Sequence, residues 1–147
     1  MDTDRFGKHI SLIYRYSQIF FNPLLNKYNL GSGQYQFLMT LYDNNGIIQE
    51  QLSKLVKLDK ATTARAIKKL EKEGYVFRMT SEDDKRAQKL YTTKKAAAVR
   101  EYLENVLDSW NKIMLENFSQ DQKEQLFELI EKVGSNIINY FAEQESN

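Results

Sequence analysis

Most of the side chains in this 147-residue sequence that could take part in binding or catalysis are cations. The sequence has one histidine, His9, and no cysteine. It has no glycine-rich phosphate loop and no convincing pair of nucleophile and base, so we expect neither an enzyme nor a bound cofactor. The absence of cysteine excludes disulfides, thiolate metal ligands and a thiol redox switch. Recognition through lysine and arginine is the chemistry that remains.

Basic residues are concentrated in the middle third of the chain. The net charge of +1 alone would argue against a nucleic-acid partner, because phosphate binding usually leaves an excess of Lys and Arg. However, residues 57–95 contain 12 Lys and Arg against 6 Asp and Glu, whereas residues 96–147 contain 4 against 10. The middle third therefore offers positive charge to phosphates, and double-stranded DNA is the expected partner.

Two helices and a hairpin must position these cations. Apolar residues at three- and four-residue spacing predict a helix of about two turns from Ile48 to Val56 and a second helix from Asp59 to Gly74, where glycine suits the stop. The period changes to two at residues 75–79 and 89–92, on either side of the polar loop 81–86, which predicts a two-stranded hairpin. This order indicates a winged helix-turn-helix head, and a fold that is mainly α with a small β-hairpin wing.

The second of these helices carries side chains suited to the major groove. Its first turn has hydroxyls and a lysine, where backbone amides also favour a phosphate. We assign Arg65 and Thr62 to base edges and the lysines to phosphates, although Thr63 also lies on the helix's apolar stripe. The residues predicted to contact DNA from this helix are Lys60, Thr62, Thr63, Arg65, Lys68 and Lys69.

An alternative role is open for three lysines of this helix. Lys68, Lys69 and Lys72 alternate with acidic residues, as on a solvated amphipathic helix. On that hypothesis they face water and pair with Glu71 or Glu73 on the same helix. The charge pattern favours neither role over the other.

The predicted wing loop brings further cations together. Lys85, Arg86 and Lys89 lie within five residues, and an arginine at a hairpin tip can enter a narrow, electronegative minor groove. Arg86 is the best candidate for that contact, while Asp84 is expected to hold the wing by accepting hydrogen bonds from Arg86, Arg65 or backbone donors. The carboxylates at 82–84 resemble a metal site, but such a run without a nearby histidine is more often solvated, so no metal is expected.

Apolar stripes at both ends of the chain predict long helices that need a partner. Residues 4–28 have helical spacing, and Pro23 should end or kink this helix. Residues 95–145 contain two further helices, the second opened by Ser119 and Gln122 at capping-box spacing. Since a small head at residues 30–94 cannot cover these stripes, we expect dimerisation helices, and a homodimer whose chain of residues 1–147 is a single domain. The alternative is that the terminal helices pack only on their own chain.

Nothing in the sequence indicates a membrane segment or an export signal. The first four residues, Met-Asp-Thr-Asp, have neither a basic start nor an apolar run. Nowhere do even ten consecutive apolar residues occur, far fewer than a spanning helix needs. The expected location is the cytoplasm, with no membrane partner.

The sequence resembles the MarR family of multiple-antibiotic-resistance regulators over essentially its whole length. Residues 30–38, LGSGQYQFL, are similar to the family's segment entering its second helix. Residues 58–65, LDKATTAR, and residues 70–76, LEKEGYV, resemble its recognition helix and the exit from it.

The wing carries the most specific part of the resemblance. Asp84, Arg86 and Thr93 match the family's Asp-x-Arg signature and the terminal Leu-Thr to which it leads. Two positions depart from the pattern: Thr92 stands where leucine is usual, and Ala96 stands where glycine is usual.

The resemblance implies a triangular homodimer whose two winged heads read a pseudo-palindromic operator and repress, or less often activate, nearby genes. In many members, small anionic aromatic compounds loosen DNA binding by settling between the dimerisation helices and the head. Aromatic rings and one cation suit such a ligand, although core packing is the commoner role of aromatics at helical spacing. The candidate ligand residues are Tyr14, Arg15, Tyr16, Phe20 and Tyr35.

Two other functions are compatible with the same fold. A winged helix can bind another protein, since fold does not fix function, but the convergence of Lys60, Arg65 and Arg86 on one face argues against this. A DNA coat that ignores sequence would rely on phosphate contacts alone, and its affinity would fall steeply as salt rises. Competition with unrelated duplex separates these alternatives from a sequence-specific regulator.

Overall fold

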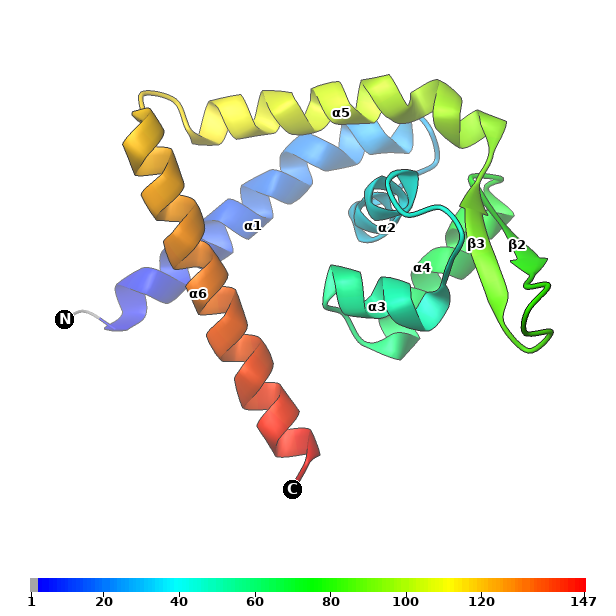
Figure 1. Ribbon diagram of the computed structural model, residues 1–147. Helices are drawn as coiled ribbons and strands as arrows, with labels where there is room; N and C mark the ends of the chain where they lie inside the picture. Colours follow the sequence, from blue (N-terminus) through cyan, green and yellow to red (C-terminus); the bar gives the residue numbers. More distant parts are fainter. Residues whose placement is uncertain (1–2) are drawn as a thin grey trace. The chain divides into compact units, whose positions relative to one another are not determined.

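The computed structural model describes residues 3–147 and confirms the expected class, mainly α with a small β wing (Figure 1). The chain divides into two compact units, one ending at Trp110 and the other beginning at Asn111. The elements in chain order are α1 (Thr3–Asn26), α2 (Ser32–Tyr42), β1 (Ile47–Ile48), α3 (Gln49–Val56), α4 (Lys60–Lys72), β2 (Val76–Thr80), β3 (Gln88–Thr92), α5 (Lys94–Met114) and α6 (Gln120–Glu145).

Helix α1 continues past Pro23 for almost one further turn, to Asn26. Phe21 and Leu25, on either side of the proline, are 5% and 1% exposed, so burial of this last turn outweighs the loss of one backbone donor. The chain turns at Asn29, whose φ of 56° is left-handed. Of the two outcomes expected at Pro23, an end or a kink, the helix does not end there.

Helices α3 and α4 form the expected helix-turn-helix. The C-cap of α3 is Lys57, with a left-handed φ of 61°. The carboxylate of Asp59 caps α4 by accepting a hydrogen bond from the backbone N–H of Thr62 at 3.0 Å. After α4 the chain turns at Gly74, whose φ of 80° is costly for any residue with a Cβ. The core-facing side of α4 is formed by Thr63, Ala66, Ile67 and Leu70.

The wing hairpin belongs to a three-stranded antiparallel sheet with the order β1-β3-β2. In the hairpin, Arg78 of β2 lies opposite Leu90 of β3. Strand β1 adds Ile47 opposite Leu90 and Ile48 opposite Lys89. The predicted hairpin of β2 and β3 is confirmed, but β1 was not predicted and the assignment of Ile48 to a helix is wrong, because a two-residue strand is too short for alternation to reveal it.

The two departures from the family pattern both have local partners. Ala96 is fully buried, and its carbonyl accepts a hydrogen bond from the hydroxyl of Tyr42 at 2.5 Å. Thr92 donates from its backbone N–H and its hydroxyl to Oδ1 of Asn45, at 2.7 Å and 3.2 Å. Strand β3 and the start of α5 are therefore held firmly to the rest of the first unit.

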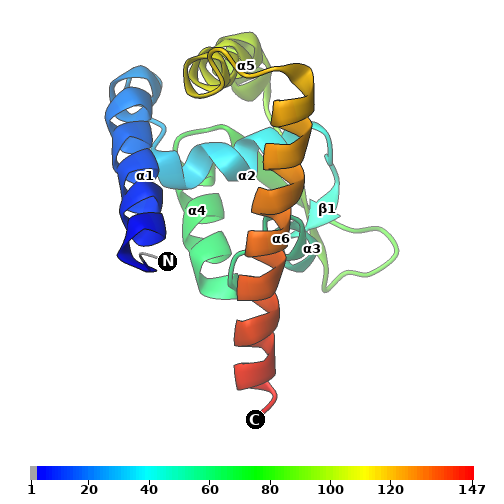
Figure 2. The same ribbon diagram turned by 90° about the vertical axis from the view of Figure 1, so that its left-hand side faces the viewer.

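The second unit consists mainly of α6, which runs as one uninterrupted helix (Figure 2). Its predicted capping box is confirmed: Ser119 Oγ accepts from the backbone N–H of Gln122 at 3.2 Å, and Gln122 Oε1 accepts from the backbone N–H of Ser119 at 2.9 Å. No residue of α6 is buried. Within residues 3–147, no helix has the length and apolar content that crossing a membrane requires.

Candidate nucleic-acid interface

The outward side of α4 carries the cations that the sequence analysis selected. Lys60, Arg65, Lys68 and Lys69 are exposed, and Thr62 is half-buried. They lie outward because the opposite side of the helix is anchored in the core by Ile67 and Leu70, which are 0% exposed. The helix therefore presents a row of charged side chains to solvent on a rigid support.

The first turn of α4 organises Arg65 through Thr62 and Asp59. The Thr62 hydroxyl donates to Oδ1 of Asp59, so its oxygen is left to accept a hydrogen bond from the Arg65 guanidinium at 3.2 Å. The hydroxyl and the backbone N–H of Thr62 both bond to the carboxylate and hold the pKa of Asp59 below its ordinary value. The guanidinium is thus directed along the helix surface before any ligand binds.

Thr63 is a correction to the predicted set. Its side chain is 0% exposed, and its hydroxyl donates to the backbone carbonyl of Asp59 at 2.9 Å. It belongs to the buried stripe of α4 and is not exposed on the outward side of the helix. The prediction that Thr63 contacts DNA is therefore wrong, and its role is to support the first turn.

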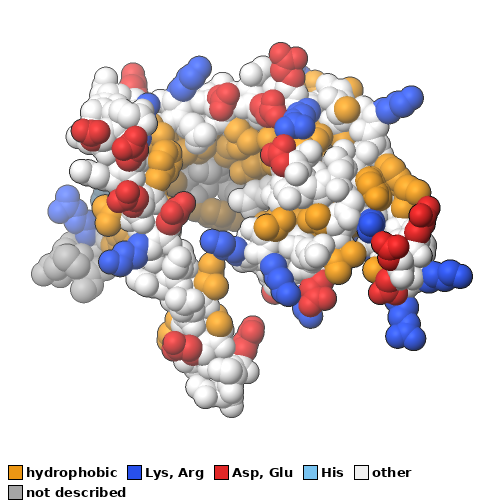
Figure 3. All heavy atoms as spheres, viewed as in Figure 1, with side chains coloured by type: hydrophobic (Ala, Val, Ile, Leu, Met, Phe, Trp, Pro, Cys, Tyr) orange, Lys and Arg blue, Asp and Glu red, His pale blue; other side chains and the backbone are white. Residues whose placement is uncertain are grey.

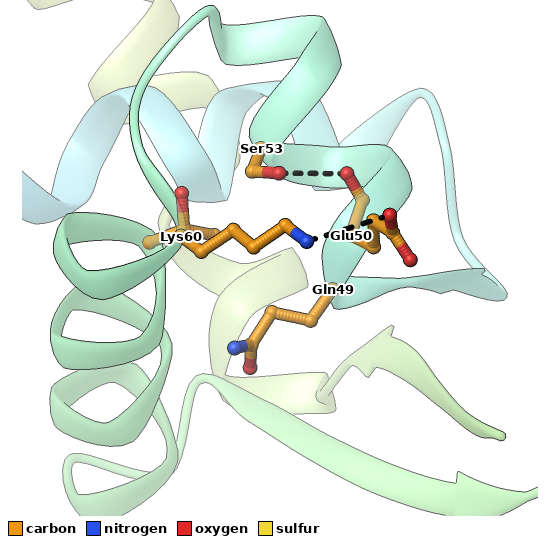
Figure 4. Close-up of a pocket in the computed structure, with 5 residues that line it drawn as sticks. Gln49, Glu50, Ser53 and Lys60 are labelled. Atoms are coloured by element: carbon orange, nitrogen blue, oxygen red, sulfur yellow. Dashed lines mark hydrogen bonds and ion pairs between the residues drawn. The ribbon is translucent and has the colours of Figure 1, made fainter. Parts of the chain in front are cut away.

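Lys60 lies beside a small cavity of about 170 Å³ between α3 and α4 (Figure 4). Its ammonium is 3.7 Å from Oε1 of Glu50, on α3. Both side chains are more than half exposed, so the attraction is weak and leaves the lysine able to turn outward. The cavity is lined by Gln49, Glu50, Ser53, Lys60 and Thr63.

The remaining lysines of α4 lack the acidic partners that the solvated-helix hypothesis gave them. Glu71 bonds to Arg78 of β2, with Arg78 Nε donating to Glu71 Oε1 at 2.8 Å. Across residues 3–147, neither Lys68 nor Lys69 makes an ion pair. The two lysines are exposed and available to an anionic partner.

The wing loop is held by its own hydrogen bonds. Oδ1 of Asp84 accepts from the backbone N–H of Arg86 at 3.0 Å, and the backbone N–H of Ala87 donates to the carbonyl of Asp84, also at 3.0 Å. The Ser81 N–H closes the loop by donating to the Ala87 carbonyl at 2.9 Å. This arrangement leaves the side chain of Arg86 exposed at the tip of the hairpin.

The cations of the wing differ in exposure. Lys85 and Arg86 are exposed, whereas Lys89 is half-buried on β3 opposite Met79. Lys and Arg side chains project beside a group of carboxylates at the lower right of Figure 3, where the wing ends. In the part of the chain that the structure describes, these carboxylates form no cluster suited to a metal ion.

Three residues that border this surface are not predicted from the sequence. Gln49 and Arg78 line a cleft together with Lys85 and Arg86, and Glu50 reaches Lys60. No pattern in the sequence indicates these contacts, because they join residues 10 to 37 positions apart on different elements. The one available signal was the positive charge of Arg78, but the spacing of residues 75–79 indicates only that this arginine lies in a strand.

The five candidate ligand residues do not line a single pocket. Tyr16 and Phe20 share an apolar cleft with Trp110, whereas Tyr35 lines a separate one with Met39. Arg15 lies 5.6 Å from the centre of the Tyr16 ring. Tyr14 lines neither cleft and is 68% exposed.

Part of this aromatic set packs in the core, as the alternative hypothesis held. Phe20 stacks on Trp110 with ring centres 4.8 Å apart, and Tyr35 stacks on Phe21 at 5.2 Å. Phe20 and Phe21 contact edge to face at 5.5 Å, which joins the two stacks. Burial raises the pKa of the Tyr35 hydroxyl above its ordinary value.

Comparisons with known sequences agree with the geometry. Residues 30–87 match the sequence model of the MarR family. The chain is also 35% identical over 130 residues to the HTH-type transcriptional regulator YybA of Bacillus subtilis (strain 168), an alignment that covers 88% of this chain and 87% of that protein.

Solved structures extend the similarity to the whole fold. A MarR transcriptional regulator from Methanosarcina mazei Go1 is 38% identical with a TM-score of 0.80, covering 94% of this chain and 99% of that chain. A MarR family regulator from Listeria monocytogenes, solved in complex with 26mer DNA, is 29% identical with a TM-score of 0.79 and coverages of 97% and 93%. The chain therefore belongs to the MarR family, whose members are winged helix-turn-helix transcriptional regulators and not enzymes.

Proposed function

We propose that this protein is a homodimer that binds a pseudo-palindromic site in duplex DNA and represses transcription of nearby genes. One observation carries the proposal: a single rigid head presents the exposed cations of α4 and, beside them, the cations of a wing that is hydrogen-bonded into a fixed loop. The Listeria monocytogenes relative that was solved with 26mer DNA supports this choice of partner.

In this proposal, α4 lies in the major groove with its first half toward the bases. Arg65 is the base-reading residue, because a guanidinium can donate two hydrogen bonds to one guanine edge. Thr62 lies next to it and offers its hydroxyl oxygen. Lys60, Lys68 and Lys69 contact phosphates, which fixes the register of the helix without reading sequence.

The wing contacts the adjacent minor groove. Arg86 is exposed at the tip of the loop, and Lys85 and Lys89 follow the backbone on either side. A narrow minor groove concentrates negative potential and attracts an inserted arginine. Asp84 does not contact DNA in this scheme, since its carboxylate is engaged by the Arg86 backbone.

Exposed apolar side chains support dimerisation. The N-terminal half of α1 exposes Phe6, Ile10 and Ile13 by 60%, 49% and 47%, and α6 exposes Ile137 and Phe141 by 54% and 61%. Soluble monomers rarely leave such contiguous apolar faces in water, and a stable interface buries roughly 1,200–2,000 Å². A two-fold dimer would then place two copies of α4 on half-sites about one helical turn apart.

We also propose that a small anionic aromatic ligand weakens DNA binding. The cleft lined by Tyr16, Phe20 and Trp110 is apolar and open. Arg15, whose guanidinium lies 5.6 Å from the centre of the Tyr16 ring, would supply the counter-charge. Trp110 is the single tryptophan and lines this cleft, so its fluorescence reports on binding there. Benzoate should quench that emission in the unmodified protein and much less in Arg15→Gln; equal quenching in both would contradict this role for Arg15.

The regulator function is tested by binding to duplex DNA from immediately upstream of the protein's own gene and to duplexes selected from a random-sequence pool. The assay uses physiological salt and excess unrelated duplex, since phosphate contacts alone give salt-sensitive, competitor-sensitive binding. Competitor-resistant binding to either DNA supports a sequence-specific regulator. Binding that unrelated duplex removes would favour a DNA coat, and no binding to any duplex would favour a protein-binding module.

A further inference from the structure

We propose that Arg78, at the root of the wing, is a positioning residue for DNA recognition. Its guanidinium ties β2 to α4 and α3 and so sets the spacing between the wing tip and the recognition helix. The inference rests on the proposed function, because it assumes that Arg65 and Arg86 engage the same duplex. Arg78 itself needs no contact with DNA.

The guanidinium of Arg78 joins three elements. Its Nε donates to Oε1 of Glu71 on α4 at 2.8 Å, and its terminal NH2 donates to Oε1 of Gln49, the first residue of α3, also at 2.8 Å. The side chains of Arg78 and Glu71 are only 28% and 33% exposed, so solvent screens this pair less than a surface ion pair. Gln49 completes the arrangement from the other helix of the helix-turn-helix.

The chemistry of arginine suits this role. The planar guanidinium has donors in fixed directions, so two acceptors on different helices define its position. A lysine in the same place would offer a single charged atom on a flexible stem and would not fix both distances. Because Arg78 is on β2 and its partners are on the two helices, any tilt of the hairpin away from the helices must break a charge-assisted hydrogen bond.

The position of Arg78 links it to the wing tip. Arg78 lies three positions before Ser81, where the internally bonded loop begins. The loop behaves as one unit because Ser81, Asp84 and Ala87 are bonded to one another. Arg78 and Gln49 also line the same cleft as Lys85 and Arg86. Fixing the position of Arg78 therefore fixes the root of the hairpin whose loop carries Arg86.

The other strand of the hairpin is held from its far side. β3 pairs with β1, and Asn45 accepts two hydrogen bonds from Thr92. On β2, by contrast, the neighbours of Arg78 in sequence, Phe77 and Met79, face outward and are 41% and 54% exposed. Arg78 thus supplies the polar link between β2 and the recognition helix.

A double-mutant cycle tests the positioning role. The substitutions are Arg78→Met, which keeps the length of the apolar stem, and Arg86→Ala, measured in the full-length protein on a duplex selected from a random-sequence pool. In the unmodified background, Arg86→Ala should weaken binding about tenfold. In the Arg78→Met background it should weaken binding less than about threefold, because an unanchored wing no longer places Arg86 productively.

The matched control is Arg100→Met. Arg100, like Arg78, donates to two side chains, here Glu104 at 2.7 Å and Asp43 at 2.9 Å, but it belongs to α5 and not to the wing. In this background Arg86→Ala should keep its full effect. Equal effects of Arg86→Ala in the Arg78→Met and Arg100→Met backgrounds would overturn the positioning role. Failure of the pool to yield any preferred duplex would instead overturn the proposed function.

A second measurement needs no DNA. Amide hydrogen exchange along β2, the strand that carries Arg78, should quicken at least threefold in Arg78→Met and in the milder Glu71→Gln, but not in Arg100→Met. Glu71→Gln keeps an acceptor oxygen and preserves packing, so hydrogen exchange in this variant tests the inference even if Arg78→Met is poorly folded. Unchanged exchange in both variants would overturn the inference.

Discussion

The side chains at the start of α4 share one network, in which a carboxylate orders a hydroxyl and the hydroxyl orders a guanidinium. Asp59 accepts from both the hydroxyl and the backbone N–H of Thr62, and Thr62 accepts from Arg65. The network restricts the rotamers of Arg65 before binding, which reduces the entropy that DNA recognition must overcome. Asp59 is therefore expected to affect both the stability of α4, which it caps, and the affinity for DNA, through the order it gives Arg65.

The lowered pKa of Asp59 gives a prediction for stability against pH. A carboxyl group whose pKa falls on folding adds stability that is complete above its ordinary pKa of 3.8 and is lost as the pH falls through the folded value. Asp59→Asn keeps an acceptor for the helix cap but carries no charge. The stability advantage of the unmodified protein over Asp59→Asn, measured by urea unfolding, should therefore be larger at pH 7 than near pH 3. An advantage that does not change with pH would contradict this account.

In the proposed function, Arg65 is the base-reading residue. Arg65→Ala should cost roughly 1 to 3 kcal/mol of binding free energy and relax the preference at one base of each half-site. Lys72→Ala, at the exposed last residue of α4, is the control and should leave the preferred sequence unchanged. The measurement is selection from a random pool followed by titration of single-base variants. An unaltered base preference in Arg65→Ala would remove Arg65 from the readout.

Residue types in the site could be predicted better than their orientations. Spacing places Lys60, Arg65, Lys68 and Lys69 on one side of a helix, and all four are exposed. The sequence leaves two roles open for Thr63, because it lies in the first turn and also on the apolar stripe. Its side chain is buried, so it belongs to the stripe. The contact of Arg78 with Gln49, 29 residues apart, depends on how strand and helices pack, which no local pattern encodes.

Among the elements, the turn between α4 and β2 determines where the wing begins. Gly74 has a φ of 80°, and a Cβ built on it would meet only Lys95 Cδ at 3.8 Å, so substitution costs backbone strain without a steric clash. Gly74→Ala should lower the free energy of unfolding by roughly 1 to 2 kcal/mol. Gly33→Ala, in α2 with open space around it, should instead raise it by up to about 1 kcal/mol. Urea unfolding measures the free energy of unfolding of both variants. An unchanged free energy of unfolding in Gly74→Ala would show that the turn can relax to accept a Cβ.

Long periodic helices could be predicted from the sequence, whereas short or interrupted elements could not. α4 and α6 have caps and apolar stripes several turns long, so their types and approximate bounds followed from spacing alone. β1 has two residues and exists because β3 offers a free edge. α1 passes through Pro23 because buried residues on both sides hold its last turn, a tertiary effect that a local rule for proline does not include.

At the scale of the whole molecule, the proposed function requires two copies of the chain. A charge at Ile137, in the middle of the apolar stripe of α6, should separate the copies without unfolding the helix, because the residue makes no contact with a core in its own chain. Ile137→Glu is therefore expected to sediment as a monomer and to bind operator DNA at least tenfold more weakly, since both half-sites are no longer engaged together. Ser135→Glu, on the opposite side of the helix, is the matched control and should remain dimeric. A dimeric Ile137→Glu would exclude this stripe from the interface.

The central claim is that two copies of this chain read one pseudo-palindromic site in duplex DNA. The most direct test is sedimentation of the protein with a duplex selected from a random pool, in excess unrelated duplex at physiological salt. The account predicts two chains per duplex, a selected sequence with two-fold symmetry, and half-site centres about 10 base pairs apart or a multiple of that spacing. One chain per duplex, or a pool that yields no preferred sequence, would contradict it.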